Sequence, residues 1–133
     1  MTRINVIPVQ ELSDQWLIAE YRELPRALKG HFSLKNAPEN YVLGAGHIKW
    51  ARKYALFTHK RMYDIIKEMD YRGFKHTFSA DLSKYITLEM NNDYKVKKAD
   101  VELNRARLIN KYLAKPSFYR WTKRNKPTYL QGE

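Results

Sequence analysis

Two groups near the start of the chain, the backbone amine of Thr2 and the carboxylate of Glu23, have the types needed for imine chemistry. Thr2 follows the initiator methionine, and a second residue this small normally allows that methionine to be removed. An unperturbed α-amine has a pKa of about 7.7–8.0, so a substantial fraction of such amines is uncharged near neutral pH. Uncharged amines attack carbonyl carbons and form imines. Glu23 lies between Arg22 and Arg26 and is a candidate acid or base for the accompanying proton transfers.

Both residues also have simpler interpretations. A terminal residue such as Thr2 usually has no role beyond ending the chain. Glu23 on its own reads as a surface helix glutamate paired with Arg22 or Arg26, whose charges would keep its carboxylate ionised. A contact between Thr2 and Glu23 would be tertiary, so spacing alone does not establish it.

The charge balance points to a polyanionic partner. The chain has 133 residues, 25 of them basic and 14 acidic, for a formal net charge of +11. The first forty residues are neutral overall, so the positive excess lies in the remainder. A positive field attracts nucleic acid, and lysine or arginine contacts to phosphate release counterions. Ordinary solubility charge is the alternative, but a chain this basic and aromatic favours nucleic acid.

Several classes of protein are disfavoured by composition. There is no cysteine, which excludes disulfides, cysteine zinc ligands and a thiol nucleophile. The four histidines lack metal-ligand spacing, so no metal site is expected. Chemistry by one amine and one carboxylate needs no cofactor, so none is expected either. No apolar run approaches the roughly 20 residues of a membrane span, and the charged start does not read as a signal peptide. We therefore expect an intracellular protein without a membrane partner.

Apolar residues recur at helical spacing in three segments, and no segment alternates convincingly as a strand would. The first begins near residue 13 and continues to residue 28, with a kink expected at Pro25, which cannot bond to the carbonyl one turn before it. The second spans 47–72 and ends at Gly73. The third spans about 97–115. The predicted inward faces are Leu17, Tyr21, Leu24 and Leu28; Ala51, Tyr54, Thr58, Met62, Ile65 and Met69; and Ala99, Leu103, Ala106 and Leu113.

These elements predict an all-α fold in one compact domain, residues 1–133, with three main helices and long connecting loops. A helical turn is expected within the irregular segment 74–96, near residues 82–85. Residues 3–9 must run extended close to the core. His47, after two glycines at a tight helix entry, reads as a packing or capping residue rather than a catalyst. Tyr21 is equally suited to the core and to lining a pocket.

Several short motifs resemble the phage pyrimidine-dimer DNA glycosylase/AP lyase family, also called UV-repair endonuclease V. The resemblance extends over nearly the whole chain and is densest in the first 26 residues. The motifs are Thr2-Arg3-Ile4-Asn5, Glu11-Leu12, Asp14-Gln15, Ala19-Glu20-Tyr21-Arg22-Glu23-Leu24-Pro25-Arg26, Leu43-Gly44-Ala45-Gly46-His47, Arg72-Gly73-Phe74, Ala106-Arg107-Leu108 with Lys111, and an aromatic and basic tail after Pro116.

The resemblance implies that the α-amine of Thr2 is the nucleophile and that Glu23 is the acid or base. It also assigns DNA contacts to a further set of residues, for which a solvated surface charge or a hydrophobic clamp is the alternative. That set is Arg3, Gln15, Arg22, Arg26, Arg107, Lys111, Tyr119, Arg120 and Trp121. Flipping of a nucleotide out of the duplex is implied as well, because chemistry at C1′ requires access to a stacked base.

The chain departs from the family pattern in three places. Trp16 stands where the best-known member has histidine, and it would either stack into the distorted duplex or pack within the protein. The loop after Arg26 is shorter and less basic. The tail diverges after Trp121. These differences affect the expected choice of lesion and the scanning of undamaged DNA more than the amine and carboxylate chemistry.

The sequence thus predicts a monomeric DNA repair enzyme, expected by resemblance in the cytoplasm of a bacterial host. Its partner would be double-stranded DNA containing UV photoproducts, from which it excises cyclobutane pyrimidine dimers as an N-glycosylase with β-elimination AP lyase activity. Two alternatives remain. One is the same chemistry on abasic sites or ring-opened purines, and the other is a non-enzymatic DNA-binding module of the same fold.

Overall fold

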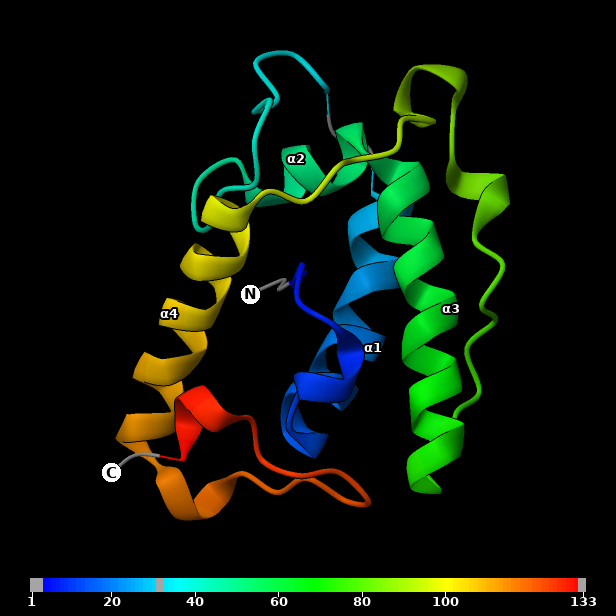
Figure 1. The fold of residues 1–133 in the computed structure, drawn as a ribbon. Helices are drawn as coiled ribbons and strands as arrows, with labels where there is room; N and C mark the ends of the chain where they lie inside the picture. Colours follow the sequence, from blue (N-terminus) through cyan, green and yellow to red (C-terminus); the bar gives the residue numbers. More distant parts are fainter. Residues whose placement is uncertain (1–3, 31–32, 132–133) are drawn as a thin grey trace.

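The computed structural model describes residues 4–30 and 33–131 and is helical throughout, with no β-strand in those two ranges (Figure 1). This confirms the predicted all-α fold class. Five 3-10 turns accompany the helices, and none of the described helices is both long and apolar enough to cross a membrane. The helices are α1 (Asp14–Lys29), α2 (His47–Lys53), α3 (Ala55–Arg72) and α4 (Lys98–Ala114).

Helix α1 begins where the sequence predicts. Ser13 is its N-cap, and its hydroxyl accepts a hydrogen bond from the Trp16 N–H at 3.1 Å. Such a cap satisfies one of the backbone donors that a helix start leaves unpaired. The helix continues through Pro25 to Lys29, as its apolar periodicity indicates, and the predicted inward residues are all buried.

The helix predicted over residues 47–72 is two helices. Helices α2 and α3 meet at Tyr54, whose φ of −107° and ψ of 50° are not helical. The Thr58 hydroxyl donates to the Ala51 carbonyl at 2.8 Å across this break. The buried residues keep their spacing across the break, except that Tyr54 is only half-buried, so periodicity alone does not reveal it. Gly73 ends α3 with a φ of 86°, in the left-handed region that favours glycine.

Helix α4 has nearly the predicted bounds, but the prediction of its inward face is wrong. The apolar residues assigned to that face, Ala99, Leu103, Ala106 and Leu113, are exposed. The buried residues are Asp100, Asn104 and Leu108. Two of these three are polar, because they accept hydrogen bonds from backbone N–H groups: Asn104 from Val6 and Ile7, and Asp100 from Lys97. A rule that places apolar residues inside therefore selects the wrong side of α4.

An extended N-terminal segment, residues 4–8, leads into the 3-10 turn Val9–Glu11 and lies between α4 on one side and α1 and α3 on the other (Figure 1). Backbone groups of this segment are hydrogen-bonded by side chains, where a β-sheet would use the backbone of a neighbouring strand. The Asn104 side-chain oxygen accepts from the Val6 N–H at 2.7 Å and from the Ile7 N–H at 3.3 Å, while its nitrogen donates to the Asn5 side-chain oxygen at 2.8 Å. The prediction that this segment runs close to the core is confirmed for its described residues.

A buried ion pair fixes the other side of the segment. The Arg61 guanidinium of α3 pairs with Glu20 of α1 and donates to the Ile7 carbonyl at 2.7 Å. Glu20 also accepts from the Asn5 side-chain nitrogen at 2.8 Å. Buried charges need such complete pairing. Residues from α1, α3 and α4 thus converge on one stretch of backbone, which fixes the direction in which the chain approaches its amino terminus.

The C-terminal tail is attached to the start of α1 and the end of α3 by a second buried charge network. Asp14 accepts from the Thr122 hydroxyl at 2.6 Å and from Arg72 at 2.9 Å. Glu68 accepts from Arg72 and from Arg124, each at 2.9 Å. Burial acts to raise the pKa of Glu68, but these hydrogen bonds and charges outweigh it and hold that pKa below its usual value.

Replacing Glu68 by glutamine should lower the free energy of unfolding at pH 7 by about 3 kcal/mol, since the buried Arg72 then keeps Asp14 but loses its second carboxylate partner, and Arg124 loses its ion pair with Glu68. Because the folded-state pKa is depressed, the ionic contribution is complete above the unfolded-state value of about 4.3 and is lost as pH falls through the folded-state value. Urea unfolding at pH 7 and pH 3 should therefore show a smaller difference from wild type at pH 3. An equal difference at both pH values would contradict this assignment; Glu102→Gln, on the exposed face of α4, is the control.

Candidate functional site

The exposed face of α1 carries a ridge of three residues predicted to contact DNA. Gln15, Arg22 and Arg26 follow one another at spacings of seven and four residues, which places them on one side of the helix. Arg22 is exposed, as is the Arg26 side chain at 72%. Gln15 uses its side-chain oxygen to accept from the Arg120 N–H of the tail at 3.1 Å. The structure thus brings four of the predicted residues to one surface.

Glu23 lies beside this ridge, on the side of α1 that also carries Ala19 one turn earlier. Its side chain is only 21% exposed, and a carboxylate oxygen lies 3.5 Å from an Arg26 nitrogen. An unconstrained surface glutamate would be more exposed.

A pocket of about 70 Å³ lies between the N-terminal segment, α1 and α4. Its lining includes Ile4 and Ala19 together with Arg107 and Lys111, the two α4 residues predicted to contact DNA. The pocket therefore brings the described start of the chain together with the α1 face that precedes Glu23. Thr2 and Arg3 lie outside the described residues.

Ile4 is held at this pocket by two side chains that bond to its backbone. His47 Nε2 accepts from the Ile4 N–H at 2.8 Å, and the Tyr41 hydroxyl donates to the Ile4 carbonyl at 2.8 Å. His47 is buried, in agreement with its interpretation as a packing residue. Its bond to Ile4, and the role of Tyr41, were not predicted. The only hint of the His47 bond in the sequence was the position of this histidine directly after a glycine-rich loop.

The aromatic tail packs against α1. The Tyr119 ring centroid lies 4.5 Å from that of Trp16, and the Trp121 ring meets Trp16 edge-on at 6.1 Å. Trp121 Nε1 also donates to the Glu11 carbonyl at 2.9 Å. Trp16 is itself buried and lines the pocket beside Ile4. Of the two interpretations of Trp16, packing within the protein is the one this geometry supports, and the tail rings act at least in part as a clamp.

No cluster of three or more histidine, cysteine, aspartate or glutamate side chains suited to a metal ion occurs within residues 4–30 and 33–131. The charged groups gathered at the pocket and ridge are instead arginines and lysine, with Glu23 beside them. This combination of cations around one carboxylate suits a polyanionic substrate and a proton transfer.

A family model described as pyrimidine dimer DNA glycosylase matches residues 1–82, which is more than half of the chain. The chain belongs to this family. The activity that the family name gives is glycosylase action on pyrimidine dimers in DNA, and DNA is accordingly its substrate. The family resemblance in the N-terminal motifs is thereby confirmed.

The match to the pyrimidine dimer DNA glycosylases covers only part of the site. It includes α1 with Arg22, Glu23 and Arg26, and it includes His47. It ends at residue 82, so Arg107, Lys111 and the aromatic tail lie beyond it. Arg107 and Lys111 are linked to the site because they line the pocket beside Ile4. The tail is linked to it through its contacts with α1.

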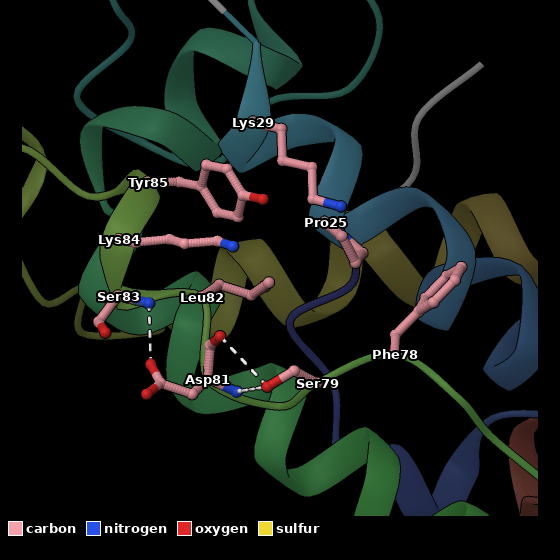
Figure 2. A pocket seen from close by; sticks show the side chains of 9 residues that line it. All are labelled: Pro25, Lys29, Phe78, Ser79, Asp81, Leu82, Ser83, Lys84 and Tyr85. Carbon is pink, nitrogen blue, oxygen red and sulfur yellow. Dashed lines mark hydrogen bonds between the residues drawn. The ribbon is translucent and has the colours of Figure 1, made fainter.

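A second pocket, of about 340 Å³, lies between Pro25 and Lys29 of α1 and the segment 78–85 (Figure 2). By helical spacing, Pro25 and Lys29 lie on the opposite side of the α1 ridge from Ala19 and Glu23. Figure 2 shows the Lys29 and Lys84 ammonium groups and the Tyr85 hydroxyl directed into the same space. The Phe78 ring, 44% exposed, forms another part of the wall. It stacks on Tyr21 at 4.7 Å between centroids.

Tyr21 supports the loop that forms this wall. Its hydroxyl accepts from the Thr77 N–H at 2.8 Å and from the Phe78 N–H at 2.7 Å. The side chain is 6% exposed and does not line the pocket. Of its two predicted roles, core packing is therefore the one observed.

Proposed function

We propose that this chain, acting as a single domain and as a monomer, is an N-glycosylase with AP lyase activity that excises cyclobutane pyrimidine dimers. In this proposal the α-amine of Thr2 is the nucleophile, after removal of Met1, and Glu23 is the acid or base. The observation that carries the proposal is the fixed position of Ile4 at the pocket shared with Ala19, Arg107 and Lys111. Two Cα–Cα steps span at most about 7.6 Å, so the amine is tethered to that pocket.

The proposed reaction needs one amine and one carboxylate. The uncharged amine attacks C1′ of the damaged nucleotide, the N-glycosidic bond breaks with its electron pair moving to the base, and the base takes up a proton. The sugar ring opens to leave an imine between C1′ and the enzyme nitrogen. The Glu23 carboxylate then removes a C2′ proton, and the electron pair of that C–H bond expels the 3′ phosphate. Water finally hydrolyses the imine and frees the amine.

The cationic groups supply the phosphate contacts in this proposal. Arg3, Arg22 and Arg26 hold the strand near the lesion, while Arg107 and Lys111 reach it from α4. Gln15, Tyr119, Arg120 and Trp121 extend the contact surface past the start of α1, where Gln15 and Arg120 are joined. One guanidinium group can bind two oxygens of the same phosphate. This bidentate contact positions the DNA strand as well as attracting it.

Lys111→Gln should weaken binding to damaged and undamaged duplex to the same extent, because a phosphate contact carries no sequence information. The slope of log K against log salt concentration should become shallower by about 1. Fluorescence anisotropy over a salt series measures this. Lys67→Gln, an exposed lysine on α3, removes the same charge and should leave the slope unchanged; an equal change in both variants would contradict the assignment.

The pocket of Figure 2 supports the flipping of a nucleotide. Reaction at C1′ requires a base to leave the stack, and an unstacked base needs a surface that replaces its neighbours. The exposed Phe78 ring offers a stacking face, and the ammonium groups of Lys29 and Lys84 can neutralise the attached phosphate. The pocket adjoins α1 through Pro25, across the ridge from the Ile4 pocket.

Borohydride trapping tests the proposal, because it reduces an imine to a stable amine and links the DNA to the chain. A duplex with one dimer and a duplex with one abasic site should both give an adduct that maps to Thr2. An adduct with the abasic duplex alone would indicate the same chemistry on another lesion. Complete absence of an adduct, with protein shown by mass spectrometry to begin at Thr2, would leave a DNA-binding module.

A further inference from the structure

The backbone of Ile4 is bonded from both sides by groups that are themselves fixed. On one side, His47 Nδ1 donates to the Val42 carbonyl at 2.7 Å, which leaves Nε2 as the acceptor for the Ile4 N–H. This arrangement requires the neutral imidazole, since a doubly protonated ring would present a second N–H to a donor. Both ring nitrogens are therefore hydrogen-bonded to backbone groups.

The turn that leads into His47, the first residue of α2, is closely packed. Gly46 precedes His47 with a φ of 87°, and a Cβ at that position would lie 2.9 Å from the Pro38 side chain. The His47 ring stacks on Trp50 and meets Tyr41 edge-on, with centroids 6.2 and 5.7 Å apart. Close backbone packing and two aromatic neighbours thus set where Nε2 lies.

Tyr41 provides the second bond to Ile4. Burial and the nearby Glu20 carboxylate raise the pKa of Tyr41, so its hydroxyl stays protonated and donates to the Ile4 carbonyl. The Tyr41 N–H is in turn bonded to the Tyr94 hydroxyl at 3.0 Å. The two peptide groups that flank the Ile4 Cα are therefore held by His47, the first residue of α2, and by Tyr41 in the segment that precedes α2.

We propose that His47 and Tyr41 are positioning residues for the nucleophile: by holding both peptide groups of Ile4, they set the direction and reach of the terminal amine toward the substrate. This inference rests on the proposed function. Chain termini usually fray, so an enzyme that uses its terminal amine needs a fixed point close to it. Ile4 is that point, two residues from Thr2.

Two substitutions of His47 separate its two hydrogen bonds. A glutamine side chain can place an oxygen near the Nε2 position and keep the acceptor for Ile4. An asparagine side chain reaches only the Nδ1 position, so it keeps the bond to Val42 and loses the one to Ile4. Under single-turnover conditions with saturating protein, His47→Asn should slow imine trapping by about 100-fold, the cost of a misplacement of about 1 Å. His47→Gln should recover most of that loss.

Tyr41→Phe removes the other bond and keeps the ring, so it is an independent test if His47 variants fold poorly. Tyr54→Phe is its matched control, because the Tyr54 hydroxyl donates to the Glu39 carbonyl at the same 2.8 Å distance and makes no hydrogen bond to residues 4–9. Tyr41→Phe should slow trapping, and Tyr54→Phe should not. The dissociation constant for DNA should stay within about threefold in all four variants, a change of under 1 kcal/mol.

Hydrogen exchange at the Ile4 amide gives a readout that is independent of catalysis. The amide should be protected in wild type and His47→Gln and should exchange rapidly in His47→Asn, while core amides of α3 remain protected in all three. Equal trapping rates in Asn and Gln variants, or an Ile4 amide that stays protected in His47→Asn, would overturn the inference. Failure of the wild type to form any adduct would instead overturn the proposed function.

Discussion

Replacing Glu23 by glutamine is expected to lower the rate of strand cleavage at a dimer by about 10³-fold, within the usual range for removal of a general acid or base. The amide has nearly the same shape but cannot accept the C2′ proton. The carboxylate is already restricted by its position, with 21% of the side chain exposed and an Arg26 nitrogen at 3.5 Å. The loss should therefore appear in the chemical step. Single-turnover cleavage with saturating protein measures that step directly.

Binding must be measured alongside, because Glu23→Gln also removes one negative charge near DNA. Glu102→Gln on the exposed face of α4 changes net charge by the same amount and should cleave at the wild-type rate. Tight binding with slow cleavage is the expected result for the Glu23 variant. Cleavage within about tenfold of wild type, a difference of about 1.4 kcal/mol, would assign the proton transfer to another group.

Insertion of one glycine between Met1 and Thr2 should reduce imine trapping by at least about 100-fold. Removal of the methionine then exposes a glycine amine one residue, or about 3.5 Å, farther from Ile4 along the chain. The amine is chemically equivalent, so only its position changes. The expected loss comes from geometry, with DNA affinity close to wild type.

Thr2→Ala is the matched control for this experiment. Alanine is also small enough to allow removal of Met1, and it keeps an α-amine at the same position while deleting the hydroxyl. Trapping by Thr2→Ala should match wild type, and mass spectrometry should place the adduct on residue 2. Loss of trapping in Thr2→Ala, with the α-amine still exposed, would show that imine formation needs the Thr2 hydroxyl as well as the amine. Undiminished trapping by the glycine insertion would show that another nitrogen reacts.

The local features of this fold could be predicted because they are encoded locally. Ser13 as a cap, the passage of α1 through Pro25 and the end of α3 at Gly73 each depend on a few neighbouring residues. The break at Tyr54 could not be predicted in this way, because the buried residues on both sides share one periodicity.

The site was predictable only in part, for a physical reason. The ridge of Gln15, Arg22 and Arg26 follows from helical spacing, and the role proposed for Glu23 follows from family resemblance. The polar residues that hold the N-terminal segment were missed, because Asn104 and Arg61 bond to backbone more than fifty positions away. Neither spacing nor polarity indicates such a partner, and on α4 the apolar residues pointed to the wrong face.

The bonds from Asn104 to Val6 and Ile7 join positions 98 and 97 residues apart. The backbone at residues 6 and 7 therefore cannot make these bonds until α4 has been synthesised. In the proposed function, this delay gives a processing enzyme time to remove Met1 before the N-terminal segment docks. We expect maturation of the terminus to precede folding, and a chain that ends before α4 to carry a processed amine with no site in which to use it.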